Sequence, residues 1–393
     1  MLIDSAITAW SRSGSLQAAQ KAEVLLKNME ALYEAGNSSL QPSAQIYTSV
    51  ITAWANSNSP GSALRAEVLL KVLWAMYKRG NESAKPNVHA FTACINAWAR
   101  SREKEAGERA EALLNQMIKL YEIGVINEKP NVLTFTSAMH AYARTGVRDA
   151  ASKANDILKK MEKMGVKPNL QTYNVLMSLW GNSQQQGAGR KAESILTTLE
   201  DEYRSGRKDM RPTVVSYTSC INAWAKSTDY GKAKSAKAVL DRMKEMHETG
   251  LISDKPNEVS FTAVINACAT TYGEHDEKQE AFHIAYNAFK EISESDEFRP
   301  NHVTYSTFLR AISKLMPAGE KKDSIVSTAF RLCVRDGQCD ANCLFHMRNA
   351  ASSNLCSDLL GCDNPSEAAK LSLDDLPADW TCNVKSSQRK RLI

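Results

Sequence analysis

The sequence predicts an all-α fold, a right-handed solenoid in which helix-turn-helix repeats stack side by side. Three observations lead to this prediction. Prolines recur at intervals of 44, 44, 38, 44, 44 and 44 residues, at positions 42, 86, 130, 168, 212, 256 and 300. A basic residue followed by Ala-Glu keeps the same register, at Lys21, Arg65, Arg109 and Lys191. Apolar residues within each interval lie three or four positions apart, which is the spacing of one helix face.

The first helix of each unit is expected to begin close to an aromatic residue that follows the proline. Phe91, Ile95 and Trp98 fall on one stripe of such a helix. Leu133 and Phe135 alternate as in a strand, but no alternation persists beyond three or four residues, so a helix is favoured. Small residues would let helices approach closely and tryptophans would fill the space between hairpins, at Ala53, Ala97, Ala141, Ala223, Ala267, Trp10, Trp54, Trp98, Trp180 and Trp224.

A polar turn and a second helix complete each unit. Residues 101–108 and 227–234 are such turns, and residues 109–121 and 191–203 are typical of the second helix. The proline then closes the linker, because it cannot continue a helix interior but suits the start of the next helix. A single hairpin cannot bury two apolar stripes, so hairpins must stack on their neighbours.

Composition limits the classes of function. The 393 residues include 49 Lys and Arg and 44 Asp and Glu, so a net charge of +5 excludes binding of acidic partners by bulk charge alone. Nine cysteines form no compact framework, and Cys94, Cys220 and Cys268 lie in apolar helical segments, which favours a reducing compartment. No run of about 18 apolar residues is present to predict a membrane span.

The first residues of the sequence match the interior of a repeat. Residues 7–10 (ITAW) repeat residues 51–54 (ITAW), although a complete unit would have begun slightly earlier. We therefore expect the sequence to be a fragment, with any targeting peptide missing from it rather than shown to be absent.

Three segments resemble the pentatricopeptide repeat of the P type: KPNVLTFTSAMHAYARTG from residue 129, KPNLQTYNVLMSLW from residue 167 and RPNHVTYSTFLRAI from residue 299. Units of that family begin with Pro and Asp or Asn, two variable residues, Thr or Ser, an aromatic residue, and then Asn, Thr or Ser. The end of the family's second helix is similar to MEKMGVKPN at residues 161–169. The resemblance covers residues 2–315, about eight units, whereas the tetratricopeptide signature is not followed.

The repeats are longer than the family's usual length of about 35 residues. We expect the extra length in the turn between the two helices and before the proline, as in residues 77–87 and 121–131. The second helix would then be longer, or an extra loop would lie on the outer side. The expected domains are a truncated repeat at residues 1–43, repeats 2 to 8 at residues 44–315 with the last one continuing to about 333, and a capping helix with a basic tail at residues 334–393.

The resemblance implies binding of single-stranded RNA, about one base per repeat, read by two or three side chains. The implied readers are the residue after the aromatic and the residue after the next proline. The pairs are Thr48 with Asn87, Thr92 with Asn131, Thr136 with Asn169, Asn174 with Thr213, Thr218 with Asn257, and Thr262 with Asn301. In the family, Thr with Asn is associated with adenine and Asn174 with Thr213 leans toward a pyrimidine, so the implied target is about 5′-A-A-A-Y-A-A-3′, with the N-terminal repeats at its 5′ end. Asp4 with Ser43, and Ser306 without a clear partner, match less well.

An alternative explanation for these residues is helix capping, since Thr and Asn are common near helix starts. The same two choices in six units favour base recognition over capping. The prediction requires that the Thr and Asn side chains face a shared groove in which bases can lie.

Two further sets of residues are implied to contact RNA. The position two residues after the Pro-Asn pair sandwiches bases in the family, and here it holds His89, Leu133, Val215, Val259 and Val303, with Gln45 and Gln171 fitting less well. Cations recur at the end of the first helix, where they would contact phosphates or interact with the helix dipole. These cations are Arg12, Arg100, Arg144, Lys226 and Lys314.

No catalytic or metal motif stands out. Cys333, Cys339, Cys343 and His346 lack the paired spacing that zinc sites use, so a capping helix is the better interpretation of this segment. His275-Asp276-Glu277 is not followed by Pro-Cys-x-x-Cys, so the deaminase signature of some family members fails. We expect no enzyme activity and no cofactor.

The predicted function is sequence-specific binding of single-stranded RNA, by a monomer, in organellar RNA processing, stability or translation. The resemblance implies a mitochondrion or chloroplast, with other RNA-processing proteins as further partners and no membrane. The alternative is a protein–protein interaction scaffold of the tetratricopeptide kind.

Overall fold

The computed structural model describes residues 2–384, without the side chains of residues 2–4 and 38. Every regular element in this part of the chain is helical. The chain forms two compact units, residues 1–183 and residues 184–393, which are described separately. The all-α fold of helix-turn-helix repeats predicted from the proline period is thereby confirmed.

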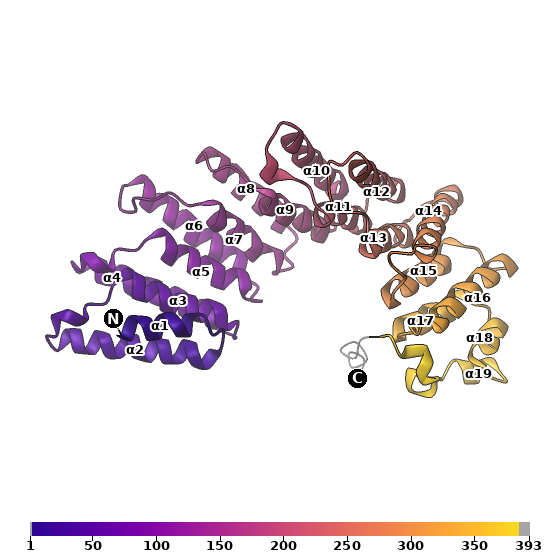
Figure 1. Ribbon diagram of the computed structural model, residues 1–393, viewed down its shortest axis with the longest axis horizontal. Helices are drawn as coiled ribbons and strands as arrows, with labels where there is room; N and C mark the ends of the chain where they lie inside the picture. Colours follow the sequence, from indigo (N-terminus) through magenta and orange to yellow (C-terminus); the bar gives the residue numbers. More distant parts are fainter. Residues whose placement is uncertain (1, 385–393) are drawn as a thin grey trace. The chain divides into compact units, whose positions relative to one another are not determined.

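The described part of the first unit, residues 2–183, contains nine α-helices that alternate between two roles (Figure 1). The first helices of its hairpins are α1 (Leu2–Ser11), α3 (Ala44–Ser57), α5 (Val88–Arg100), α7 (Val132–Ala143) and α9 (Leu170–Ser183). The second helices are α2 (Leu16–Glu34), α4 (Ser62–Lys78), α6 (Ala106–Glu122) and α8 (Ala150–Lys163). Short 3₁₀ helices, η1 (Ser38–Leu40) and η2 (Glu82–Ala84), precede two of the first helices.

The second unit continues the alternation. Its first helices are α11 (Val214–Lys226), α13 (Glu258–Ala269), α15 (His302–Leu315) and α17 (Ala341–Ala350). Its second helices are α10 (Ala188–Arg204), α12 (Lys232–Glu248), α14 (His275–Ser293) and α16 (Glu320–Arg335). Shorter elements are η3 (Lys208–Met210), α18 (Ser353–Leu360), α19 (Pro365–Ala368), η4 (Leu373–Asp375) and η5 (Ala378–Thr381).

The helices of each unit form two layers. Within a unit, neighbouring first helices pack against each other, as α5 does with α3 and α7 and α13 does with α11 and α15. Second helices pack against the first helices beside them in the same unit, as α6 does with α5 and α7. The residues at the starts of successive first helices therefore lie side by side within a unit.

A buried carboxylate explains why Ala-Glu recurs in the second helices. The Glu67 carboxylate accepts a hydrogen bond from the Trp98 indole at 3.1 Å and pairs with Arg109 at 3.5 Å. Trp98 belongs to the next first helix and Arg109 to the next second helix, so one side chain joins two repeats. Glu23 joins Trp54 and Arg65 in the same way, and Glu193 joins Trp224 and Arg242. The sequence motif is an interface motif between repeats.

The extra length of the 44-residue units lies partly where the sequence predicted it. In the 38-residue unit the second helix, α8, has 14 residues, whereas α6 has 17. The remaining difference lies before the proline, where Gly124 to Asn131 replaces the shorter Gly165 to Asn169. The expectation that the turn between the two helices is also lengthened is wrong: residues 101–105 connect α5 to α6, and the longer segment 144–149 belongs to the short unit.

The chain continues as helices after the predicted repeats end. α17 packs on α15 as one first helix packs on the previous one, and α16 contacts both α15 and α17. Cys333, Cys339 and Cys343 are buried in this region, and the backbone N–H of Cys339 donates to the carbonyl oxygen of Trp380 at 2.8 Å. The basic tail at 385–393 lies outside the described residues.

Candidate nucleic-acid interface

An asparagine precedes most first helices and accepts hydrogen bonds from the helix start. Asn131 is the N-cap of α7, and its Oδ1 accepts from the backbone N–H and from the hydroxyl of Thr134, each at 3.0 Å. The bond from the backbone N–H satisfies a donor that the helix start otherwise leaves unpaired. The backbone bond recurs, at 2.9–3.1 Å, at Asn87, Asn169, Asn257 and Asn301. The capping role is confirmed for these five asparagines.

Capping occupies only the oxygen of the amide. Asn131 is exposed, and its Nδ2 donates to no residue in the described part of the chain. The same holds, among described residues, for Nδ2 of Asn87, Asn169 and Asn257. Asn301 differs, because its Nδ2 donates to Glu258 at 2.8 Å. An amide nitrogen carries two donors, so the first four asparagines keep donors for a ligand.

The threonines after the aromatic residues are less accessible than the sequence predicted. Thr92 is 6% exposed, Thr136 3% and Thr218 9%, so the expectation that they lie open in a groove is wrong. The reason is that successive first helices pack directly on each other, which covers this position. Their hydroxyls bond across that contact, Thr92 with Thr134 at 2.8 Å, Thr136 with Thr172 at 2.9 Å and Thr218 with Ser260 at 3.1 Å. Thr262, which is half-buried, bonds with Thr304 at 2.8 Å.

Two of the predicted pairs differ from this arrangement. Half-buried Thr48 donates its hydroxyl to the Ala44 carbonyl of its own helix at 2.7 Å. Asn174 and Thr213 belong to different compact units, so they are described separately. The Oδ1 of Asn174 is buried without a hydrogen bond to described residues, and the Thr213 backbone N–H donates to Ser216 at 3.2 Å. The side chain of Asp4 lies outside the described part of the structure.

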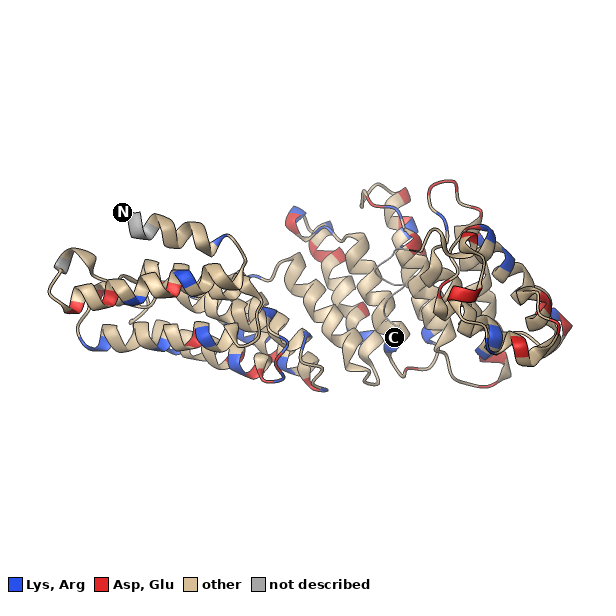
Figure 2. Ribbon diagram, turned by 90° about the horizontal axis from the view of Figure 1, so that it is seen from below, with Lys and Arg blue, Asp and Glu red and all other residues tan. Residues whose placement is uncertain are grey.

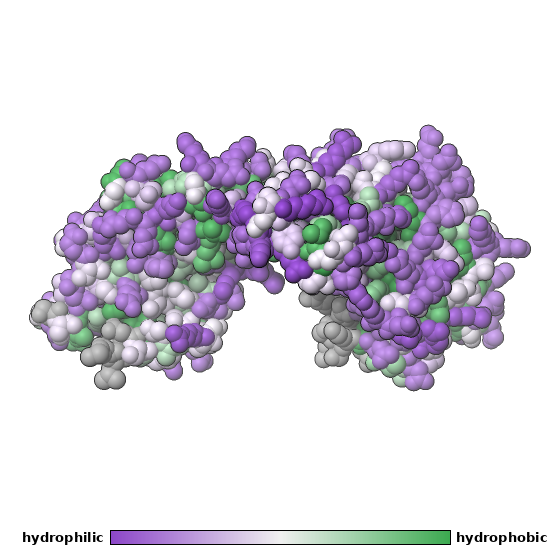
Figure 3. Space-filling model, turned by 45° about the horizontal axis from the view of Figure 1, so that its top comes forward, coloured by the Kyte–Doolittle hydropathy of each residue, from purple (hydrophilic) through white to green (hydrophobic). Residues whose placement is uncertain are grey.

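The positions predicted to sandwich bases are exposed in every repeat. Leu133 is 55% exposed, Val215 61%, Val259 51% and Val303 45%, and His89, Gln45 and Gln171 are also exposed. Each lies in the first turn of a first helix, two residues beyond the capping residue. Figure 3 shows apolar residues in small groups among polar ones on one face of the molecule. A recurring exposed aliphatic side chain beside an amide donor can contact the face of a planar ligand.

The predicted phosphate-contacting cations lie at the C-terminal ends of first helices, and all of them are exposed. They are Arg12, Arg100, Arg144, Lys226 and Lys314. Arg100 donates to Asn56 Oδ1 at 2.6 Å, and Arg144 donates to the carbonyl oxygen of Arg100 at 3.0 Å. Both therefore tie a helix end to the previous first helix. A guanidinium has five donors, so these contacts leave others for an anion.

The sequence reading missed one capping residue. Asp340 follows Asn301 by 39 positions and is the N-cap of α17, where its Oδ1 accepts from the Cys343 backbone at 2.7 Å. It therefore stands where five other repeats have asparagine, and it is the structural partner that Ser306 lacked. Cys339 replaces the proline before it, which removed the signal that marked the other repeats. The spacing after Asn301, close to the 38-residue interval, was the remaining clue.

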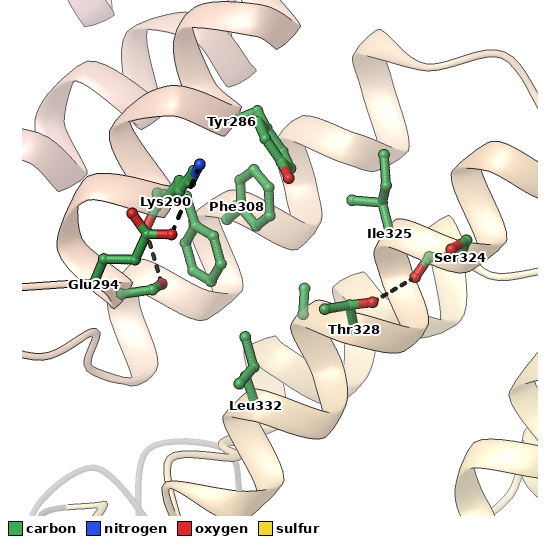
Figure 4. A pocket seen from close by; sticks show the side chains of 11 residues that line it. Tyr286, Lys290, Glu294, Phe308, Ser324, Ile325, Thr328 and Leu332 are labelled. Carbon is green, nitrogen blue, oxygen red and sulfur yellow. Dashed lines mark hydrogen bonds and ion pairs between the residues drawn. The ribbon is translucent and has the colours of Figure 1, made fainter.

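A separate cavity of about 440 Å³ lies between α14 and α16 (Figure 4). Tyr286, Phe308 and Ile325 line it, and several of its polar groups contact one another. Lys290 pairs with Glu294 at 3.8 Å, and the Thr328 hydroxyl donates to the Ser324 carbonyl at 2.9 Å. The cavity therefore presents no converging set of reactive groups.

Among the described residues, no group of three His, Cys, Asp or Glu side chains is placed to hold a metal ion. Burial raises the pKa of Cys94, and that of Cys268 to about 12, so these thiols stay protonated at neutral pH and act as packing groups. All nine cysteines are free thiols. None of the described helices has the length and apolar character needed to span a bilayer.

Comparison with known proteins gives a family match within the chain. Residues 123–183 and 205–271 match the model of the pentatricopeptide repeat domain. The structure is similar to that of pentatricopeptide repeat protein PPR10 from maize, with 17% sequence identity over 91% of this chain and 47% of that chain, and a TM-score of 0.49. It is similar also to PPR10 in complex with an 18-nucleotide psaJ RNA element, with 19% identity over 84% of this chain and 46% of that chain, and a TM-score of 0.43. The chain thus spans about half the length of these solved structures, and no curated protein matches its sequence.

Proposed function

Residues 123–183 and 205–271 match the pentatricopeptide repeat domain, and on that premise we propose that the chain binds single-stranded RNA in a sequence-selective way. The carrying observation is that capping asparagines recur at the starts of first helices with an exposed side chain two residues further on, which is aliphatic at Leu133, Val259 and Val303. In one repeat these are Asn131 and Leu133. A base splayed from single-stranded RNA offers one polar edge and two apolar faces, which these two groups match.

The asparagines and threonines have different roles in recognising the base. The exposed amide of Asn131 contacts the base edge directly, whereas buried Thr92 acts indirectly, through its hydrogen bond with Thr134. By the family resemblance, pairs of this type favour adenine. The proposed target is therefore A-rich. Asp340 adds a carboxylate acceptor beyond the last of these pairs.

The chain acts by occupancy. Bound RNA would be shielded from nucleases, held unfolded or presented to other RNA-processing proteins, and no group in the site needs to perform chemistry. The proposed setting is organellar RNA processing, stability or translation in a mitochondrion or chloroplast, with the chain acting as a monomer.

Binding to A-rich single-stranded RNA, compared with poly-U at two salt concentrations, tests the proposal. We expect the A-rich RNA to bind more tightly, with an affinity that falls as salt rises, because phosphate contacts release counterions. A protein–protein scaffold would show neither the base preference nor the steep salt dependence. Equal, salt-insensitive binding of both RNAs would therefore reject RNA recognition in favour of the scaffold.

Substitution of Asn131 by Asp is a sharper test. Asp caps helices as well as Asn, so the bond from the Thr134 backbone and the fold should survive. The exposed donor becomes an acceptor, which pairs with the imino N–H of guanine rather than with the ring nitrogen of adenine. We expect the preference at this single nucleotide to move from A toward G, measured by sequencing RNA selected from a randomised pool. A preference unchanged at that nucleotide would show that Asn131 does not read a base.

A further inference from the structure

The reading residues of adjacent repeats are joined by a third side chain that the sequence analysis did not single out. Thr134 lies three residues after Asn131, in the first turn of α7. Its hydroxyl bonds with Thr92 at 2.8 Å on one side and with Asn131 Oδ1 at 3.0 Å on the other. The same three-member network is built around Thr172, Ser260 and Thr304.

The chemistry of the groups sets the direction of this network. An amide oxygen cannot donate, so the single proton of the Thr134 hydroxyl goes to Asn131 Oδ1. Thr92 must then donate its own proton to Thr134. The oxygen of Asn131 thus receives two hydrogen bonds, one from the backbone and one from the hydroxyl, and Nδ2 is left to face the ligand.

Among the repeats capped by asparagine, the one that begins at Asn87 lacks the bridging hydroxyl. Ala90 stands where the other asparagine-capped repeats have Thr134 or its equivalents. Asn87 accepts only the Ala90 backbone N–H, at 2.9 Å, and Thr48 turns its hydroxyl to the Ala44 carbonyl at 2.7 Å. The amide of Asn87 is therefore held by one bond where that of Asn131 is held by two. This repeat shows that the helix forms without the hydroxyl.

We propose that Thr134, Thr172 and Ser260 are positioning residues that hold the reading amides with the nitrogen outward. An amide fixed in this orientation offers donors alone, which suits the ring nitrogen acceptor of adenine or cytosine. Guanine and uracil present an imino N–H at that place, and they would require the amide to turn over. The bridging hydroxyl resists that turn because turning breaks its bond to Oδ1. This inference rests on the proposed function and adds the residues that set its selectivity.

Thr134→Val in the full chain tests the proposal, with bound RNA selected from a randomised pool and sequenced. Valine has a similar shape but no hydroxyl, and Thr92 can then bond to its own helix as Thr48 does. Loss of one hydrogen bond of ordinary strength predicts that the preference for A or C over G or U falls about five-fold at the nucleotide read by Asn131. Other nucleotides should keep their preference. Ala90→Ser should raise the preference at the nucleotide read by Asn87 by a similar factor.

A matched control separates positioning from packing. Thr197→Val makes the same chemical change on α10, where the exposed Thr197 hydroxyl bonds only to the Glu193 carbonyl at 3.1 Å. It should leave the preference unchanged at every nucleotide. If both variants still bind RNA and the preference stays at its wild-type value at the nucleotide read by Asn131 in Thr134→Val and at the nucleotide read by Asn87 in Ala90→Ser, this inference alone is overturned. A wild-type chain without preference at any nucleotide would overturn the proposed function and this inference together.

Discussion

At the scale of single residues, helix capping uses only one of the two polar atoms of the asparagine amide. Asn131 Oδ1 accepts the hydrogen bonds of the helix start, whereas Nδ2 donates to no described residue. From the sequence, helix capping and base recognition were alternatives, because a pattern of residue types cannot show which polar atom of an amide makes which hydrogen bond. It also could not show that Thr92 is covered, since burial at that position depends on how closely α5 and α7 pack.

The repeat interface carries a charged residue whose contribution should depend on pH. Glu23 accepts from Trp54 at 3.0 Å and from Arg65 at 2.8 Å. Burial raises the pKa of Glu23, but hydrogen bonds and charge from Arg65 and Lys27 outweigh it and hold the pKa below the ordinary 4.5. The folded-state pKa is thus lower than the unfolded one, so this stabilisation is present above about pH 4.5 and is lost as the pH falls through the folded value.

Glu23→Gln should therefore lower the free energy of unfolding by about 1 kcal/mol at pH 7, since Arg65 is partly exposed and its ion pair is screened. The loss should shrink in acid as wild-type Glu23 becomes protonated. Thermal unfolding of both proteins at pH 7 and pH 3 measures the two differences. Glu34→Gln on the exposed end of the same helix, where no ion pair to described residues is made, is the control and should change neither. An equal loss at both pH values would contradict the charge-based account.

At the scale of elements, close approach of a second helix to the next first helix depends on small residues. Gly189 in α10 lies against the ring of Trp224 in α11, and a Cβ at this position would fall well inside the van der Waals distance of that ring. Gly107 in α6 meets the ring of Tyr142 in α7 in the same way. These glycines are required by packing, and the aromatic residues they admit are buried.

Gly189→Ala should destabilise the protein by about 1–3 kcal/mol, because overpacking forces the ring or the helix to move. Helix propensity alone predicts the opposite sign, since alanine is favoured over glycine by about 1 kcal/mol in a helix interior. The free energy of unfolding of Gly189→Ala, measured by chemical denaturation, decides between overpacking and helix propensity. The same substitution in a Trp224→Leu background should lose its penalty, because the shorter side chain vacates the space. A penalty that persists without Trp224 would locate the strain elsewhere.

The elements that the sequence predicts well are those whose signals are local. Phe91, Ile95 and Trp98 mark a helix by spacing alone, and proline marks its start, so the alternation of helices in both units follows from the chain. A capping helix was predicted after residue 333, but not that α17 repeats the first-helix position, because Cys339 replaces proline before Asp340. The distribution of extra length between α6 and the following linker was only partly predicted, since helix ends depend on tertiary contacts rather than on residue type.

At the scale of the whole molecule, charge is distributed rather than concentrated. Lys and Arg lie among Asp and Glu along the helices and loops of both units (Figure 2), in keeping with a net charge of +5. Several acids are neutralised within the repeat interfaces, as Glu67 is by Lys71 and Arg109. Within the described part of the chain, Arg100 and Arg144 at first-helix ends bond to uncharged oxygens and to no carboxylate. Their charge is therefore not neutralised there, which fits the proposed contact with phosphates.

This arrangement predicts how RNA affinity should depend on salt. For single strands, the slope of log affinity against log salt is about −0.7 per phosphate contacted. If both guanidiniums touch phosphate, the variant with Arg100→Gln and Arg144→Gln should bind A-rich RNA more weakly and with a slope shallower by about 1.4. Glutamine can still donate to Asn56 and to the carbonyl of residue 100, so the links between helices should persist. Arg190→Gln on the second helix α10 removes the same charge from an exposed site and should leave the slope unchanged. A double variant that weakens binding at an unchanged slope would assign these arginines to helix packing instead, because only a lost phosphate contact alters the number of ions released.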